Sequence, residues 1–224
     1  MKMLRNFTIR FVMLTILGIF CVMWAGVGLY STWSLSRVSD GNDVDRQLVR
    51  QMTVLSQGND QYFRFVTRLS RAMEVKAAGG TPDLAPAQQA LDNMSKKLAE
   101  MKAISPGPMD EKVSAQVIST WQALLDRGVT PQMARAKQAT LEGYRQHANN
   151  VTPPLSRAFG SAAENINNTA AKALDSTRVV VDGLTSMTRT VIITATIVGL
   201  LILLFTDRYL VAILVKPRDR IRQQ

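Results

Sequence analysis

Apolar residues gather into two long runs near the ends of the chain, and residues at helical spacing fill the region between them. Neither residues 11–30 nor residues 190–206 contain a charged side chain, and the second run consists mainly of Ile, Leu and Val. A helix needs about 20 such residues to cross the hydrocarbon core of a bilayer, and about 17 is near the lower limit. The pattern predicts two transmembrane helices, at residues 11–30 and 190–207.

Basic residues flank both runs on the side of the chain ends. Lys2, Arg5 and Arg10 precede the first run, and five basic residues follow the second, from Arg208 to Arg222. Basic residues beside a span tend to stay in the cytoplasm. We therefore expect residues 1–10 and 208–224 inside the cell and residues 31–189 outside. A cleaved signal peptide is the alternative for the first run, but its apolar region is longer than usual for such a peptide.

The region between the runs is patterned as helices that pack against one another. Apolar residues recur at alternating steps of four and three along residues 48–76, which is typical of a helix in a bundle. Glycine and proline break the pattern at 79–82, 105–108 and 149–154, and they break or kink it at 128–131. We predict an all-α fold, with an up-down-up-down four-helix bundle at residues 31–189 whose first and last helices continue into the membrane.

Single residues refine the expected helix ends. Pro86 fits the first turn of the second helix, and Asp110 with Glu111 places negative charge at the start of the third. Thr130 is a natural cap for a continuation that reaches about residue 147. The segment 149–154 should interrupt helical structure before the fourth helix.

Charge and composition exclude several kinds of function. The chain has 27 basic and 17 acidic residues, but its two ends alone carry eight of the basic and only two of the acidic ones. The excess therefore follows the membrane topology, which favours anionic lipid headgroups over nucleic acid as a partner. Cys21 lies in the first apolar run, and His147 is the single histidine. We expect no disulfide, no metal site, no cofactor and no catalytic residues, so the chain is not expected to be an enzyme.

In this order of segments the chain resembles a bacterial chemoreceptor, that is, a methyl-accepting chemotaxis protein with a Tar-type four-helix-bundle sensor domain. Three local segments carry the resemblance. Residues 67–72, Thr-Arg-Leu-Ser-Arg-Ala, are similar to the arginine-bearing segment of the family's first sensor helix. Residues 149–153, Asn-Asn-Val-Thr-Pro, are similar to the turn that opens its fourth helix, and residues 214–217, Leu-Val-Lys-Pro, to the start of a HAMP linker.

The resemblance implies a homodimer in the bacterial inner membrane that binds a small carboxylate in the periplasm. Arginines of the first helix would hold the carboxylate, and the candidates are Arg64, Arg68 and Arg71, which fall within about 60° of one another on a helix. Asn150, Val151 and Thr152 would complete the site. Tyr144, Phe65 and Trp121 are candidates for an apolar wall that suits a cyclic or aromatic carboxylate. The alternatives are that the arginines form a solvated face and that the aromatic residues belong to the core.

One departure limits the comparison. The family's first helix usually carries another basic residue at the position of Val75, so an amino-acid ligand cannot be carried over.

The leading hypothesis is a sensor that passes ligand binding through the second span to a linker at Lys216 and Pro217. We expect the chemotaxis kinase and adaptor to be contacted only by a further cytoplasmic domain outside residues 1–224. The sensor portion of a histidine kinase or a cyclase, and a ligand-free structural membrane protein, are the alternatives.

Overall fold

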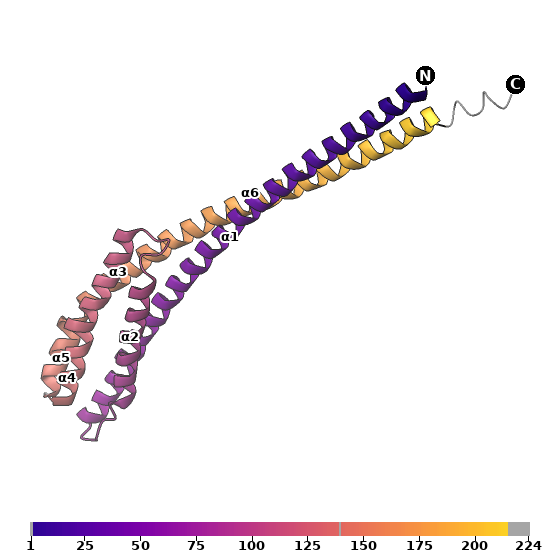
Figure 1. The fold of residues 1–224 in the computed structure, drawn as a ribbon. Helices are drawn as coiled ribbons and strands as arrows, with labels where there is room; N and C mark the ends of the chain where they lie inside the picture. The colour runs from indigo at the N-terminus through magenta and orange to yellow at the C-terminus, as the bar shows by residue number, and fades with distance from the viewer. Residues whose placement is uncertain (1, 139, 215–224) are drawn as a thin grey trace. The chain divides into compact units, whose positions relative to one another are not determined.

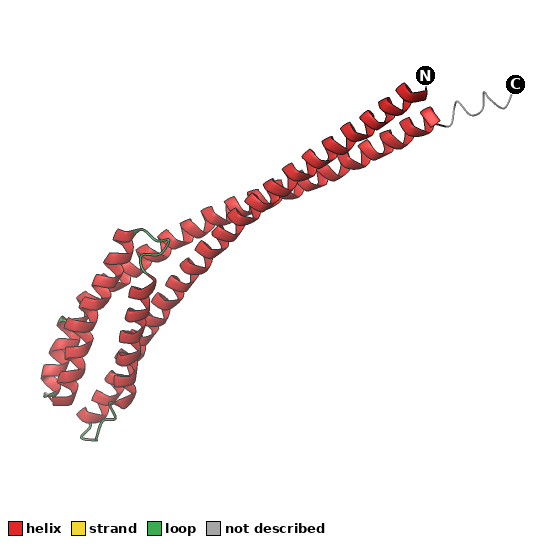
Figure 2. Ribbon diagram, in the orientation of Figure 1, coloured by secondary structure: helices red, strands yellow, loops and turns green. Residues whose placement is uncertain are grey.

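The computed structural model describes the backbone of residues 2–138 and 140–214, all of it in helices, turns and short loops. Figure 1 labels the elements, and Figure 2 shows helices joined by loops without a strand in the described part. The helices are α1 (Lys2–Ala77), α2 (Ala85–Ile104), α3 (Glu111–Ala123), the π-helix η1 (Leu124–Val129), α4 (Thr130–Gln138), α5 (Leu141–Asn150) and α6 (Thr152–Leu214). The prediction of an all-α fold is confirmed.

Contacts divide the chain into two units. One unit comprises Met1–Gly41 with Val179–Gln224, and the other comprises Asn42–Arg178. In the first unit α1 and α6 lie side by side, because Phe20 and Met23 of α1 pack against Gly199 of α6 and the Ser34 hydroxyl hydrogen-bonds to that of Thr188.

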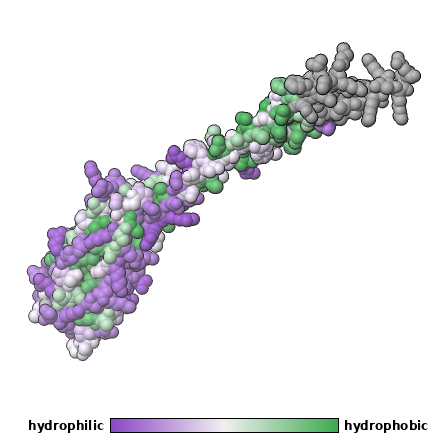
Figure 3. Space-filling model, in the orientation of Figure 1, coloured by the Kyte–Doolittle hydropathy of each residue, from purple (hydrophilic) through white to green (hydrophobic). Residues whose placement is uncertain are grey.

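The surface of this two-helix unit is apolar over much of its length. Leu14, Val22, Leu201 and Phe205 are each more than half exposed, and Figure 3 shows hydrophobic residues covering this part of the molecule. Soluble proteins rarely expose apolar area on this scale. By length and composition, the two helices that contain these residues are able to cross a membrane.

The length of α1 follows from its sequence. No proline occurs before Pro82, so nothing removes a backbone donor along the helix. The helix ends at Ala77. In the turn that follows, Gly79 has a left-handed φ of +83°, and the Gly80 N–H donates to the Val75 carbonyl at 2.9 Å. This bond satisfies a carbonyl that the helix end would otherwise leave unpaired.

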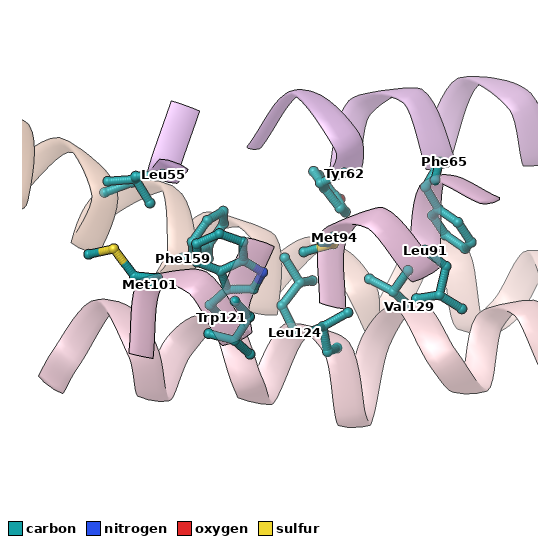
Figure 4. Packing of buried hydrophobic residues seen from close by; sticks show 14 of the residues in the cluster. Leu55, Tyr62, Phe65, Leu91, Met94, Met101, Trp121, Leu124, Val129 and Phe159 are labelled. Carbon is teal, nitrogen blue, oxygen red and sulfur yellow. The ribbon is translucent and has the colours of Figure 1, made fainter. Parts of the chain in front are cut away.

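The second unit is a helical bundle around one hydrophobic core. Leu48, Leu55 and Leu69 of α1 are buried, as the four-three spacing of residues 48–76 predicted. Figure 4 shows Trp121 of α3 beside Phe159 of α6, and their ring centroids are 5.2 Å apart. Phe65 and Trp121 are fully buried in this core and line neither of the two hollows described below.

Residues 111–150 form more separate helical segments than the sequence predicted, namely α3, η1, α4 and α5. Asp110 and Glu111 stand at the start of α3, as the sequence predicted, and Asp110 also caps the helix by accepting from the Lys112 and Val113 N–H groups at 2.9 and 3.2 Å. Where the sequence predicted a break or kink at 128–131, the π-helix η1 leads directly into α4. A new helix, α5, begins after α4 instead, and Thr140 caps it by accepting from the Gly143 N–H at 3.3 Å.

The expected interruption at 149–154 is wrong in extent. The segment between α5 and α6 is Val151 alone, and α6 starts at Thr152. Pro153 and Pro154 then occupy the first turn of α6, where the missing N–H groups would have no partner within the helix in any case.

Candidate functional site

A hollow of the bundle unit lies where α1, α4, α5 and α6 meet. It has a volume of about 610 Å³, within the usual range for small-molecule sites. Its apolar lining includes Tyr62 and Met73 of α1 and Leu141 of α5, and its polar lining comes from all four helices. Polar side chains that converge in such a hollow can fix the orientation of a ligand by hydrogen bonds.

Local helix geometry explains which residues face the cavity. Tyr62, Val66, Ser70, Met73 and Ala77 follow one another at steps of three and four along α1, and so they share one face. On α5 the same spacing brings Leu141, Tyr144, Arg145 and Ala148 to the cavity.

Three polar side chains of the cavity wall are Gln132, Tyr144 and Thr152. The Thr152 hydroxyl donates to Gln132 Oε1 at 2.6 Å, and both residues are buried. Burial raises the pKa of the Tyr144 phenol, an interaction with the Gln132 side chain opposes that rise, and the negative charge of Glu74 adds to it. The phenol is therefore neutral at physiological pH.

The charged residues of the cavity give it a positive balance. Arg145 of α5 and Arg157 of α6 line it together with Glu74 of α1. Within the described part of the chain, neither arginine forms an ion pair with an acidic side chain. Two guanidinium groups without acidic partners are suited to bind a carboxylate, which they can grip with parallel hydrogen bonds.

The three arginines proposed from the sequence lie around a different hollow. Arg64, Arg68 and Arg71 line a shallow depression of about 290 Å³ on α1, together with Phe63 and Thr67. Arg64 Nε is 2.7 Å from Asp60 Oδ2, and Arg68 Nη1 donates to the Pro86 carbonyl at 3.0 Å. The structure thus brings these arginines together but does not place them among the residues that line the larger cavity.

Of the other candidate residues from the sequence, some line the larger cavity and others line neither hollow. Tyr144 and Thr152 line the larger cavity, whereas Asn150 and Val151 are exposed and line neither hollow. Lys216 and Pro217 lie outside the described residues. His147 is buried and its Nε2 lies 2.9 Å from the Gly128 carbonyl, which ties α5 to η1. Among the described residues no group of His, Cys, Asp and Glu side chains could hold a metal ion.

Sequence reasoning missed Gln132, Arg145 and Arg157. The signal for Arg145 was its place next to Tyr144 on a short helix, and for Arg157 its place five residues after Thr152. Gln132 carries no comparable signal, because its place in the cavity wall depends on its hydrogen bond with Thr152 of α6.

Two comparisons with known proteins identify the family. The family described as Tar ligand binding domain homologue matches residues 3–174. None of the curated proteins matches the chain. A crystal structure of the N-terminal ligand-binding domain assigned to a methyl-accepting chemotaxis protein from Salmonella enterica is 65% identical in sequence, with a TM-score of 0.59. The match covers 59% of this chain and 98% of that one. The chain therefore belongs to the Tar ligand-binding domain family, the sensor domains of bacterial chemoreceptors.

Proposed function

We propose that this chain is the membrane-anchored sensor region of a chemoreceptor and that it binds a small organic anion in the cavity between α1, α4, α5 and α6. The observation that carries this proposal is the presence of Arg145 and Arg157 in the lining of a cavity of about 610 Å³. A pocket of that size favours a ligand with at least one carboxylate, because its two guanidinium groups have no acidic partner among the described residues.

The remainder of the lining indicates the rest of the ligand. Tyr62, Met73 and Leu141 offer apolar surface, and the neutral Tyr144 phenol can hydrogen-bond without adding charge. Glu74 would repel a second carboxylate placed beside it. A monocarboxylate with a ring or a short hydrocarbon body fits this distribution best.

The face of α1 that carries Arg64, Arg68 and Arg71, here called the arginine face, would act only in a dimer. Arg64, Arg68 and Arg71 border a depression that is open to solvent in a single chain, so a second copy would be needed to enclose a ligand there. In a homodimer, Arg71 is the residue of the three that can reach a shared ligand, because Arg64 and Arg68 have partners within their own chain.

Signal transmission follows from the continuity of α6. Thr152, Pro153 and Arg157 line the cavity, and the same helix runs without a break from Thr152 to Leu214. A ligand shifts the receptor only by the difference in its affinity for two states, and a tenfold preference corresponds to about 1.4 kcal/mol. Contacts to α6 that form in one state alone would supply that difference.

The chain would cross the membrane twice. Residues 11–30 and 190–207 would cross the inner membrane, with the bundle in the periplasm and the basic ends at the cytoplasmic headgroups. The two exposed apolar stretches of α1 and α6 support this arrangement.

Isothermal titration calorimetry on the full chain in lipid nanodiscs would test the site. Benzoate, malate and citrate are the probes, and benzamide is the neutral counterpart of benzoate. We expect at least one carboxylate to bind and benzamide to bind far more weakly. Arg157→Ala should weaken carboxylate binding at least tenfold, because a hydrogen bond between two charged groups is lost.

Arg46→Ala is the matched control, since Arg46 lies on an exposed part of α1 and lines neither hollow. A loss of binding in Arg71→Ala with none in Arg145→Ala or Arg157→Ala would move the site to the arginine face. Binding of none of the three carboxylates would contradict the proposal.

A further inference from the structure

Tyr30, Trp33 and Arg37 form a connected group on α1, at the end of its apolar run and just beyond it. They follow one another at steps of three and four, so they share one face of the helix. The Arg37 guanidinium carbon lies 5.6 Å from the centroid of the Trp33 ring, and the ring centroids of Trp33 and Tyr30 are 6.1 Å apart. A cation over the face of a tryptophan is attracted by the ring. The charge of Arg37 is therefore held at a defined place beside α1.

The contact with Trp33 brings this charge to the level of the lipid headgroups. With Tyr30 at the edge of the hydrocarbon core, the rise of the helix places the backbone of Trp33 about 4.5 Å and that of Arg37 about 10 Å beyond this edge. The headgroup layer on each side of a bilayer is about 5–7 Å thick. Helical side chains lean toward the N-terminus, which for this part of α1 is the membrane side. A guanidinium held over Trp33 therefore lies within the headgroup layer, although its backbone lies outside it.

The guanidinium of Arg37 is accessible to a ligand. Trp33 is 51% exposed, and Arg37 is exposed as well. Within the described part of the chain, Arg37 forms neither an ion pair nor a side-chain hydrogen bond, so its N–H groups can grip a phosphate with two parallel bonds. The Tyr30 hydroxyl, in contrast, is covered and has no hydrogen-bond partner among the described residues. Tyr30 therefore supports Trp33 through its ring and is not expected to contact the phosphate.

We propose that Arg37, positioned by Trp33, binds the phosphate of an anionic phospholipid in the periplasmic leaflet and thereby fixes the depth of α1 in the membrane. This inference rests on the membrane arrangement of the proposed function and goes beyond it by naming a lipid site. Basic residues beside a span tend to stay in the cytoplasm, so an arginine at the outer end of a span requires a contact of its own. A guanidinium without an acidic partner favours a lipid with net negative charge over a zwitterionic lipid, whose ammonium group it repels.

Native mass spectrometry of the full chain in detergent tests the site. The chain is supplied with equal amounts of phosphatidylglycerol, which is anionic, and phosphatidylethanolamine, which is zwitterionic, and the retained lipids are counted. Arg37→Ala should lower the retention of phosphatidylglycerol relative to phosphatidylethanolamine about fivefold, the effect expected of one basic residue at an anionic surface. Trp33→Ala should lower it to a similar extent although the net charge is unchanged, because the guanidinium is no longer held in place.

Two variants are matched controls. Tyr30→Phe removes only a hydroxyl without a partner and should retain lipid as the wild type does. Arg189 of α6 follows Thr188, whose hydroxyl bonds to that of Ser34, so Arg189 lies near the level of the proposed site and is exposed. Arg189→Ala removes the same charge at this level and should keep the preference for phosphatidylglycerol. A loss in Arg189→Ala equal to that in Arg37→Ala would overturn the inference, because the effect would then be one of charge alone.

Quenching of tryptophan fluorescence by brominated phospholipids in nanodiscs separates the site from the membrane arrangement. The difference between the wild type and Trp33→Phe gives the share of Trp33, and lipids brominated near the headgroup should quench that share most. If no brominated lipid quenches Trp33, the membrane arrangement fails and the inference with it. A quenched Trp33 with unchanged retention of phosphatidylglycerol in Arg37→Ala would refute the inference alone. Loss of a dimer in Trp33→Ala with unchanged lipid retention would assign this face to a second copy of the chain and overturn the inference as well.

Discussion

Replacing Gly58 by alanine tests the packing of the bundle most directly. Gly58 is buried on α1, and a Cβ atom at this position would lie 2.1 Å from both Cη2 and Cζ2 of Trp121. Ordinary contact begins at 3.4 Å, so the ring or the helix would have to move by about 1.3 Å. Trp121 is fully buried and packs on Phe159, which leaves its ring little room to move.

Two opposing terms set the size of the effect. Alanine favours a helix interior over glycine by about 1 kcal/mol. Extra volume in a well-packed core costs about 1–3 kcal/mol and occasionally more. Because the overlap involves two atoms of a rigid ring, we expect the cost to lie at or above the upper end. Gly58→Ala should then destabilise the protein by about 2 kcal/mol, despite its better helix propensity.

Thermal unfolding followed by far-UV circular dichroism measures this loss, with a Tm decrease of about 3 °C for each kcal/mol. Gly160→Ala is the control, since a Cβ at Gly160 on α6 meets nothing within 4 Å. That variant should be as stable as the wild type or slightly more so. Trp121→Phe should relieve much of the penalty of Gly58→Ala. If Gly58→Ala unfolds at the wild-type temperature or above it, α1 and α3 do not pack as described.

Three further predictions follow from single contacts. Asp110→Ala should lower the free energy of unfolding by about 1 kcal/mol in chemical denaturation, because α3 loses its N-terminal cap. Gln51→Leu should cost about 1–3 kcal/mol in the same assay, because the buried Gln51 amide donates to the Ile104 and Pro106 carbonyls at 3.3 and 3.0 Å. The raised pKa of Tyr144 predicts that stability is independent of this group below the ordinary value of 10.0 and falls as the pH rises above it, since the unfolded chain ionises first. Tyr144→Phe should flatten that decline in denaturation midpoints measured between about pH 9 and 11.

The parts of the fold that depend on local pattern could be predicted from the sequence. Leu48, Leu55 and Leu69 recur at steps that place them on one face of a helix, and that face is buried. Asp110 precedes a helix with a side chain able to bond its first N–H groups, and it does so. Such features follow from residues within one or two turns of each other, and the sequence contains all of the information needed for them.

The parts that depend on contacts between helices could not be predicted in the same way. The π-turn at η1 requires hydrogen bonds that skip one more residue than usual, and no local sequence signal separates it from a kink at Gly128. In the structure, Gly128 lies so close to α6 that a Cβ there would approach side chains of Leu124, Leu155 and Thr152. Its role is to let η1 and α6 approach each other, and only the packed bundle reveals it.

In the candidate site, too, local spacing predicted which residues share a helix face but not which helices meet. Helical spacing predicted that Arg64, Arg68 and Arg71 would share a face of α1, and they line one depression. Spacing alone could not show that Glu74 of α1 and Arg157 of α6 line the larger cavity together. Nor could it show that Gln132 and Thr152, twenty residues apart, meet at 2.6 Å. Because that contact joins α4 to α6 in the wall of the cavity, the arrangement of the wall is a property of the assembled bundle. A change that leaves every lining residue in place but separates α4 from α6 should therefore alter ligand selectivity as strongly as a change in the lining itself.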